Sequence, residues 1–320
     1  MTQLDEMAPV RTAQVDWGAP EPSPAIAAGP GATAPTMLIC IGAQKAGTTW
    51  LHSYFRDHPE VYVPPLKEVH YFDFLYGGAA NKTPVSVRLA APLQKQLGAF
   101  AAATPAKRQA MADGLVRRMD RFAMYADERR YMRFFKDRAG AHKVMCDITP
   151  GYAVVRREGF EAMRRLCGRP RILFIVRNPA DRVWSHYRFH IQKRAALNAA
   201  AADAGDLAAF MNEPHVAART RYQETLKHLD AVFPKEDVHV AFYESLFSEG
   251  ETRRICDFAG VSHRPGDYDV RVNASHATAL SAEDRRCLVQ GFGDVYGAIA
   301  ERFPAALPPS WREDMAAHLT

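Results

Sequence analysis

A glycine-bounded loop, GAQKAGTTW at residues 42–50, contains the residue types that bind a phosphate group. Gly42 and Gly47 have the spacing of the two glycines in the phosphate loop of nucleoside triphosphatases, where Lys and then Ser or Thr follow the second glycine. In this chain Thr48 follows the second glycine, and the lysine, Lys45, stands two residues before it. The loop therefore has the residue types of an anion-binding site, but its lysine stands at a different position from the lysine of the nucleoside triphosphatase loop.

This loop predicts a site for a phosphate that carries a transferable group. Backbone N–H groups at the start of a helix bind an anion, and the helix dipole adds to the attraction. Lys45 is expected to lie across the mouth of the loop, where it can neutralise charge on a departing oxygen. No Ser or Thr follows this lysine, so the loop lacks the hydroxyl that holds Mg²⁺ in enzymes that act on nucleoside triphosphates. For the glycines alone, an ordinary strand-to-helix turn remains the alternative.

A second stretch, PPLKEVHYFD at residues 64–73, combines an acid with an imidazole. If it is extended, Glu68 and His70 share one face through the two-residue period of a strand. A carboxylate and a histidine side by side can act as a base and the group that tunes it. Lys67 and Asp73 flank the pair. A polar loop beside a sheet is the competing interpretation.

The third stretch is RILFIVRNPADRVWSHYRFH, residues 171–190. Its apolar run predicts a buried strand that ends at Arg177, and the carboxyl ends of parallel strands are where open α/β sheets bind ligands. Asn178 and a following proline predict the start of a helix. Ser185, two turns into that helix, is expected to add a hydroxyl to the same anion site. We interpret Arg182 and Arg188 as solvated charges of the helix face.

The elements that must position these residues alternate along the chain. Apolar runs predict strands at 37–41, 142–148, 171–176 and 237–243, with helices at 48–58, 159–167 and 249–259 between or after them. Such alternation predicts an α/β fold with a central parallel sheet flanked by helices. Two largely helical insertions are expected at 85–138 and 190–233. The low-complexity stretch 195–210 is interpreted as a mobile lid.

Composition limits the class of protein. Residues 1–35, rich in Ala, Pro and Gly, predict a disordered tail, and residues 36–320 a single domain. A net charge of +5 fits an anionic small-molecule substrate and not a dedicated nucleic-acid binder. No apolar stretch is long enough to span a membrane. Scattered cysteines without CxxC spacing predict reduced core or near-core thiols in a cytoplasmic protein with no metal site, at positions Cys40, Cys146, Cys167, Cys256 and Cys287.

Taken together, the three stretches resemble the sulfotransferases that use 3′-phosphoadenosine 5′-phosphosulfate (PAPS). GAQKAGTTWL is similar to their 5′-phosphosulfate loop, ILFIVRNPADRVWSHY to their 3′-phosphate motif, and KEVHYFD to the acceptor segment of the 3-O-sulfotransferases. The resemblance covers residues 37–320 and is nearest to bacterial relatives of the heparan sulfate N- and 3-O-sulfotransferases. It implies a P-loop-like sulfotransferase fold with helical insertions.

The resemblance also implies roles for the donor-binding residues. The donor carries a phosphate bonded to a sulfuryl group, so the lysine of the loop, Lys45, would lie against the bridging oxygen. Arg177 and Ser185 match the positions that hold the 3′-phosphate. The complete set of implied donor-binding residues is Lys45, Ala46, Gly47, Thr48, Thr49, Trp50, Arg177, Ser185 and Tyr243.

On the acceptor side, the resemblance makes Glu68 the catalytic base, with His70 beside it as a further catalytic residue. His70 and Asp73 would contact the acceptor. In-line sulfuryl transfer is similar to loose phosphoryl transfer, in which positioning and charge stabilisation dominate. Adenosine 3′,5′-bisphosphate would be the product of the donor, and no metal is implied.

Two segments depart from the family pattern. In CDITPGY, residues 146–152, Ile148 stands where a lysine is frequent, which weakens the case for a heparan-like acceptor. In RVNASHATALS, residues 271–281, the Gly- and Lys-rich form of the donor-closing loop is missing, so Asn273 and Ser275 are weakly supported as donor contacts. An ATP-dependent kinase of similar architecture and a non-catalytic nucleotide-binding protein stay open as alternatives. The acceptor, a carbohydrate or another small molecule, and the oligomeric state are not specified.

Overall fold

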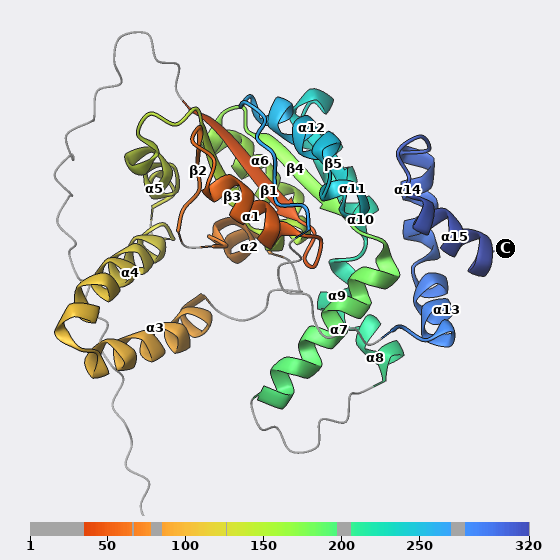
Figure 1. Cartoon of the computed structure of the whole chain (residues 1–320), viewed down its shortest axis with the longest axis horizontal. Helices are drawn as coiled ribbons and strands as arrows, with labels where there is room; N and C mark the ends of the chain where they lie inside the picture. The colour runs from red at the N-terminus through yellow and green to blue at the C-terminus, as the bar shows by residue number, and fades with distance from the viewer. Residues whose placement is uncertain are drawn as a thin grey trace, which may run out of the picture. The chain divides into compact units, whose positions relative to one another are not determined.

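The structure, a computed structural model, describes residues 35–65, 67–77, 85–125, 127–196, 206–269 and 279–319 (Figure 1). The tail predicted over 1–35 lies almost entirely outside these residues, and so does most of the predicted donor-closing loop, including Asn273 and Ser275. No helix among the described residues is long and apolar enough to cross a membrane.

A five-stranded sheet lies at the centre of the fold, in the order β2-β3-β1-β4-β5 (Figure 1). Every neighbouring pair of strands is parallel. The predicted α/β fold with a central parallel sheet is therefore confirmed. The strands are β1 Thr36–Gly42, β2 Val61–Tyr62, β3 Val144–Ile148, β4 Arg171–Val176 and β5 Val238–Phe242.

Four of these strands match the apolar runs of the sequence. The inner strands are covered on both faces and bury nearly every side chain, whereas the edge strand β5 is half-buried over its first three residues. Cys146 and its neighbours in β3, for example, are all buried. β2 was not predicted, since its two residues are too short to form a recognisable pattern. The first helix, α1 Thr48–Arg56, follows β1 directly, and its Leu51 and Phe55 are fully buried as the helical spacing predicts.

The remaining helices cover the sheet and build the insertions. Right-handed crossovers place α1 and α6 on opposite faces, since β1 connects toward β2 whereas β3 connects toward β4. The first predicted insertion comprises α3 Val85–Ala102, α4 Pro105–Ala123 and α5 Arg129–Ala139, and the second comprises the end of α7 Pro179–Ala196 with α8 Leu207–Met211, α9 Pro214–Ala218 and α10 Tyr222–Val232. Both are helical as expected. The centre of the proposed lid, 197–205, lies outside the described residues.

Short helices follow β2, β3 and β5, and further helices complete the chain. They are α2 Tyr71–Tyr76, the 3₁₀ helix η2 Pro150–Val154, α6 Arg157–Cys167, the 3₁₀ helix η3 Lys235–Asp237, α11 Tyr243–Leu246, α12 Glu249–Ala259, α13 Ala282–Gly291, α14 Gly293–Arg302 and α15 Pro309–His318. The predicted helices at 159–167 and 249–259 are thereby confirmed.

A buried polar network attaches the C-terminal helices to the start of α7. The Asn178 side chain accepts the N–H of Asp181 at 3.3 Å, which confirms Asn178 as the predicted cap. Its amide donates to Asp314 of α15 at 2.7 Å. Tyr296 and Arg285 donate to the same carboxylate, the latter from two nitrogens at 2.6 and 3.0 Å. The helix that carries the predicted 3′-phosphate residues is thus held by elements far away in the sequence.

The five cysteines are free, and three of them, Cys40, Cys146 and Cys256, are buried as predicted. Cys167 is half-buried. Cys287 is exposed, so the expectation of a core or near-core position is wrong there: α13 presents this residue to solvent while Leu288 and Val289 face inward.

Candidate active site

The loop between β1 and α1 has the backbone of an anion-binding turn. Gly47 caps α1 in the left-handed conformation, with φ of 81°. A Cβ at this position would lie 2.6 Å from Leu246 of α11, so glycine is required both by conformation and by space. Ala46 and Thr48 are buried on either side. The free N–H groups of the first turn of α1 therefore face a concave loop, which is the arrangement that binds phosphate.

Lys45 occupies this loop in a left-handed conformation with φ of 72°. Its ammonium lies 4.6 Å from the centroid of the Phe189 ring of α7. Burial, together with the positive charges of Arg177 and Arg188, lowers the pKa of Lys45 to about 8. Lys45 is thus a partly desolvated cation among other cations, and an anion placed beside it would relieve this repulsion.

Arg177 comes directly after β4 and contacts the loop, as its position in the sequence predicts. Its guanidinium donates to the backbone oxygen of Lys45 at 2.9 Å and stacks over the Tyr243 ring at 4.2 Å. Its buried Nε has no hydrogen-bond partner among the described residues. Tyr243 also lies beside Gly47, so the structure brings four of the predicted donor-binding residues together. Ser185 is buried two turns into α7.

Arg182 is not the solvated charge that we expected from the helix face. Its side chain is fully buried, and its one described hydrogen bond runs from Nη2 to the Val216 oxygen at 3.2 Å. Burial lowers the pKa of Arg182 to about 10. The expectation failed because α9 of the second insertion packs over this part of α7, which the helix pattern alone does not reveal. Arg188 is half-buried, with its guanidinium over Trp184 at 5.7 Å.

Glu68 and His70 are adjacent, although the backbone is not extended as we expected. Both residues have left-handed conformations, with φ of 62° and 58°. The turn nevertheless brings His70 Nε2 to 3.2 Å from Glu68 Oε2, while His70 Nδ1 lies 2.9 Å from Asp73 Oδ2. The imidazole is therefore held between two carboxylates. Gly151 of η2 makes room for this contact, because a Cβ there would lie 2.5 Å from Asp73 Oδ2.

The charges of this cluster support one another. Burial opposes ionisation of Glu68, but the hydrogen bond from His70 and the charge of Lys67 outweigh it and lower the pKa of Glu68 to about 2. Burial likewise opposes protonation of His70, but Asp73 and Glu68 raise its pKa to about 9. At neutral pH Glu68 is a carboxylate and His70 an imidazolium, so the neighbouring groups favour the ionised state that a base requires.

Lys67 joins the two halves of the candidate site. Its ammonium donates to Thr49 Oγ1 at 2.7 Å and to Glu68 Oε1 at 3.1 Å. A single ammonium group therefore connects the carboxylate predicted to act as the base with a hydroxyl of the predicted phosphate loop. From the sequence, Lys67 was expected only as a flanking charge. The contacts of Phe189 and Gly151 were not predicted, since an aromatic residue in a helix and a glycine in a short turn are each common without function.

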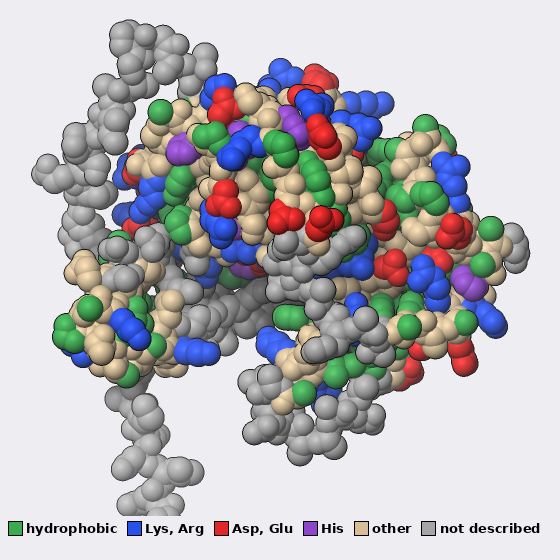
Figure 2. Space-filling view, in the orientation of Figure 1, with side chains coloured by type: hydrophobic (Ala, Val, Ile, Leu, Met, Phe, Trp, Pro, Cys, Tyr) green, Lys and Arg blue, Asp and Glu red, His purple; other side chains and the backbone are tan. Residues whose placement is uncertain are grey.

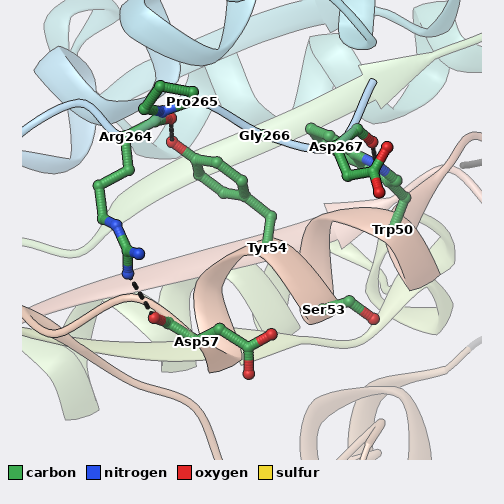
Figure 3. A pocket seen from close by; sticks show the side chains of 8 residues that line it. All are labelled: Trp50, Ser53, Tyr54, Asp57, Arg264, Pro265, Gly266 and Asp267. Carbon is green, nitrogen blue, oxygen red and sulfur yellow. Dashed lines mark hydrogen bonds between the residues drawn. The ribbon is translucent and has the colours of Figure 1, made fainter. Parts of the chain in front are cut away.

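Trp50 lies on the other side of α1, beside a cavity of about 210 Å³ (Figure 3). In this cavity Trp50, Tyr54 and their neighbours on α1 face the segment 264–267 that follows α12. The indole N–H of Trp50 donates to the Asp267 oxygen at 2.8 Å, and the Tyr54 hydroxyl donates to the Arg264 oxygen at 2.7 Å. Trp50 is 4% exposed and its ring packs against Tyr54, Phe247 and Tyr268, so it presents little surface to a ligand.

The sequence profile of the sulfotransferase family matches residues 36–265. The fold is similar to that of a sulfotransferase from Alicyclobacillus acidocaldarius, with a TM-score of 0.59, 21% identity, and coverage of 88% of this chain and 100% of that one. A sulfotransferase domain from the curacin biosynthetic pathway aligns with a TM-score of 0.46 and 15% identity over 89% of this chain and 98% of that one.

No curated protein sequence matches the chain significantly. The family match nevertheless extends over more than half of the chain and spans all three stretches of the candidate site, from the glycine loop to the helix after β4. The similarity to the Alicyclobacillus structure independently supports the parallel-sheet fold. This chain belongs to the sulfotransferase family.

Proposed function

We propose that the protein transfers the sulfuryl group of PAPS to a hydroxyl or amine of a carbohydrate or other small-molecule acceptor. The observation that carries this proposal is the bridge made by Lys67 between Thr49 and Glu68. It links a loop suited to a phosphate with a carboxylate suited to deprotonating a second substrate. In-line transfer requires these two functions on opposite sides of the group that moves.

The donor side has an excess of positive charge that fits the phosphates of PAPS. The pKa of Lys45 is lowered by burial and by Arg177, and the Nε of Arg177 has no partner among the described residues. The N–H groups and hydroxyls of Thr48 and Thr49 would bind the 5′-phosphate, and Arg177 with Ser185 the 3′-phosphate. Tyr243, beside Gly47 and under the Arg177 guanidinium, would offer an aromatic ring at this site. Trp50 was predicted as a further donor contact, but its ring is buried against the segment 264–267. Ala46 and Gly47 would contribute backbone only.

The acceptor side would supply the proton transfer. Glu68 would remove a proton from the acceptor as the bond from acceptor to sulfur forms and the bond from sulfur to the phosphate oxygen breaks. Lys45 would neutralise the charge that this oxygen gains, and adenosine 3′,5′-bisphosphate would leave. His70 and Asp73 would contact the acceptor and keep Glu68 ionised. The relation to the heparan sulfate sulfotransferase branch remains a prediction, and cytoplasmic location remains one as well.

Thermal unfolding with product nucleotide tests the proposal without an acceptor. Adenosine 3′,5′-bisphosphate at about a hundredfold excess over its Kd, with EDTA present, should raise the melting temperature by roughly 5 °C or more. ATP with Mg²⁺ should raise it far less. A larger shift with ATP and Mg²⁺ would favour the kinase alternative. Binding without transfer of label from PAPS to any component of extracts of the source cells would instead favour a non-catalytic nucleotide-binding protein.

A further inference from the structure

The segment that carries Glu68 and His70 is held by peptide groups rather than by regular secondary structure. Two of its residues are in the left-handed conformation, which costs a residue other than glycine about 1 kcal/mol or more. Such a conformation persists only where surrounding groups fix it. The peptide units that follow Glu68 and His70 are each hydrogen-bonded at both ends, which explains how the turn is maintained.

The N–H ends of these two peptide units are held from β3 and η2. Val69 N donates to Thr149 Oγ1 at 2.9 Å, and Tyr71 N donates to the Tyr152 hydroxyl at 3.0 Å. The carbonyl ends are held from the first helical insertion: Arg121 donates to the Glu68 oxygen at 3.3 Å. The Tyr125 hydroxyl donates to the His70 oxygen at 3.1 Å.

The two hydroxyls that accept these N–H groups both donate a hydrogen bond to one buried carboxylate, that of Asp147. Thr149 Oγ1 donates to Asp147 Oδ1 at 2.6 Å, and the Tyr152 hydroxyl donates to Asp147 Oδ2 at 2.9 Å. Asp147, at the end of β3, is fully buried, as are both hydroxyl residues. It also accepts from Tyr131 of α5 at 3.0 Å. The mechanism proposed above assigns no role to this buried carboxylate.

We infer that Asp147 is a positioning residue that orients Glu68 and His70 through the hydroxyls of Thr149 and Tyr152. An ionised carboxylate accepts hydrogen bonds and donates none. Each hydroxyl must therefore direct its single proton toward Asp147, which leaves a lone pair for the N–H of the turn. Asparagine would present a donor on one side and so reverse or break one of these relays.

Burial raises the pKa of Asp147 to about 6, against the hydrogen bonds from Thr149, Tyr152 and Tyr131, so the carboxylate is ionised above neutral pH. The description of Glu68 as the base rests on the proposed function, but the positioning of the turn does not. The titration of His70 reports on this positioning because its pKa depends on the placement of Glu68 and Asp73. Other charges that act on this cluster are those of Lys67 and of Asp147 itself.

The test is an NMR titration of histidine-labelled full-length protein from pH 7 to 10.5, with the His70 signal assigned by its loss in His70→Gln. Tyr152→Phe and Thr149→Val each remove one relay. Tyr131→Phe removes a hydrogen bond to the same carboxylate oxygen as Tyr152, but it keeps the ring that packs on Tyr71 and removes no hydrogen bond to the turn. The His70 pKa should fall by about 1 unit in the first two variants and stay within about 0.2 units in Tyr131→Phe.

Because Tyr152→Phe and Thr149→Val act on different peptide units, either one that remains folded decides the question. An unchanged His70 titration in a folded relay variant would overturn the inference. So would an equal shift in Tyr131→Phe, since the effect would then reflect the stability of the Asp147 cluster and not the relay. The titration needs neither donor nor acceptor. Failure of the protein to bind adenosine 3′,5′-bisphosphate would therefore overturn the proposed function and leave this result standing.

Discussion

Glu68 and His70 have opposite charges at neutral pH, and this decides which of them is available as a base. The imidazole is hydrogen-bonded on both nitrogens, to Glu68 and to Asp73, and its pKa is raised to about 9. A protonated imidazole has no lone pair to accept a proton. Of the two side chains, only the Glu68 carboxylate can therefore accept a proton in the free protein at neutral pH, and His70 is a cation that stabilises it.

The separate roles of Glu68 and Lys45 predict different kinetic effects. Glu68→Gln keeps the shape and removes the base, so turnover with an identified acceptor should fall by roughly 10²–10⁴-fold while donor affinity is nearly unchanged. Lys45→Ala should lower turnover and weaken donor binding together, because in the proposed function the lysine would already contact the donor before the reaction. Steady-state kinetics combined with calorimetry measures both. Near-normal turnover of Glu68→Gln would reject its assignment as the base.

Arg177 should contribute to donor binding without any metal. Its guanidinium is fixed between the Lys45 oxygen and the Tyr243 ring, so it is already oriented for a phosphate. Arg177→Ala should weaken adenosine 3′,5′-bisphosphate by about 2–4 kcal/mol in calorimetry with EDTA present. Arg194→Ala, an exposed arginine near the far end of α7, is the matched control and should have little effect. Equal affinities for the two variants would contradict the assignment.

The raised pKa of His70 predicts a pH dependence of stability. A folded-state pKa of about 9, above the ordinary value of 6.5, stabilises the fold fully below pH 6.5 and loses this contribution as pH rises through 9. The free energy of unfolding of the wild type relative to His70→Gln should therefore fall by about 2–3 kcal/mol between pH 6 and 10. Urea unfolding at both pH values measures it. A constant difference would show that His70 is not held between two ionised carboxylates.

At the scale of elements, the start of α7 depends on helices that follow it by about a hundred residues of chain. Asp314 of α15 accepts hydrogen bonds from Asn178, Tyr296 and Arg285 and is 4% exposed. Removing a buried carboxylate leaves its hydrogen-bond donors unpaired. The resulting loss of folding free energy is larger than the net stabilisation that the carboxylate provides. The C-terminal helices therefore support the helix that carries Ser185.

Removal of this carboxylate should destabilise the protein. Asp314→Ala is expected to lower the free energy of unfolding by about 3 kcal/mol, because the half-buried Arg285 would lose its principal partner. Glu313→Ala, at the neighbouring exposed position, should change it by less than about 0.5 kcal/mol. Denaturant unfolding of both variants provides the comparison. If the two changes are equal, Asp314 does not hold α15 against α7.

At the scale of the whole molecule, the visible surface mixes charges of both signs. Figure 2 shows Lys and Arg side chains interspersed with Asp and Glu over this face, with no single basic patch. The net charge of +5 is therefore spread over the surface. A local cluster of positive charges is found around Lys45, where Arg177 and Arg188 are close enough to lower its pKa. This arrangement suits a small anionic ligand bound at one site.

The sequence predicts that the fold begins at residue 36 and that the preceding tail is dispensable. Deletion of residues 1–35 should leave the melting temperature and nucleotide binding nearly unchanged, since a chain rich in Ala, Pro and Gly buries little apolar surface. Deletion of residues 1–39 is the control and should abolish folding, because it removes half of the central strand β1. A large loss of stability on deleting residues 1–35 would show that the tail packs against the domain.

The sequence by itself determined the class of fold and predicted the residues of the proposed donor site. Buried parallel strands such as β4 are continuous apolar runs, and the loop from Gly42 to Thr49 and the arginine after β4 are local to the strands that position them. Local patterns of this kind are readable because the strand, the turn and the helix start follow one another along the chain.

Only the tertiary structure decided how the second half of the site is built. The proximity of Glu68 and His70 was predicted, but from an extended backbone, whereas two left-handed residues produce it. That turn is held by Thr149 and Tyr152, which follow β3 far along the chain. The charge of Lys67 connects it to Thr49, and Arg182 is buried by a later insertion. These features depend on contacts between segments far apart in the chain, and the spacing of residues within one segment contains no information about them.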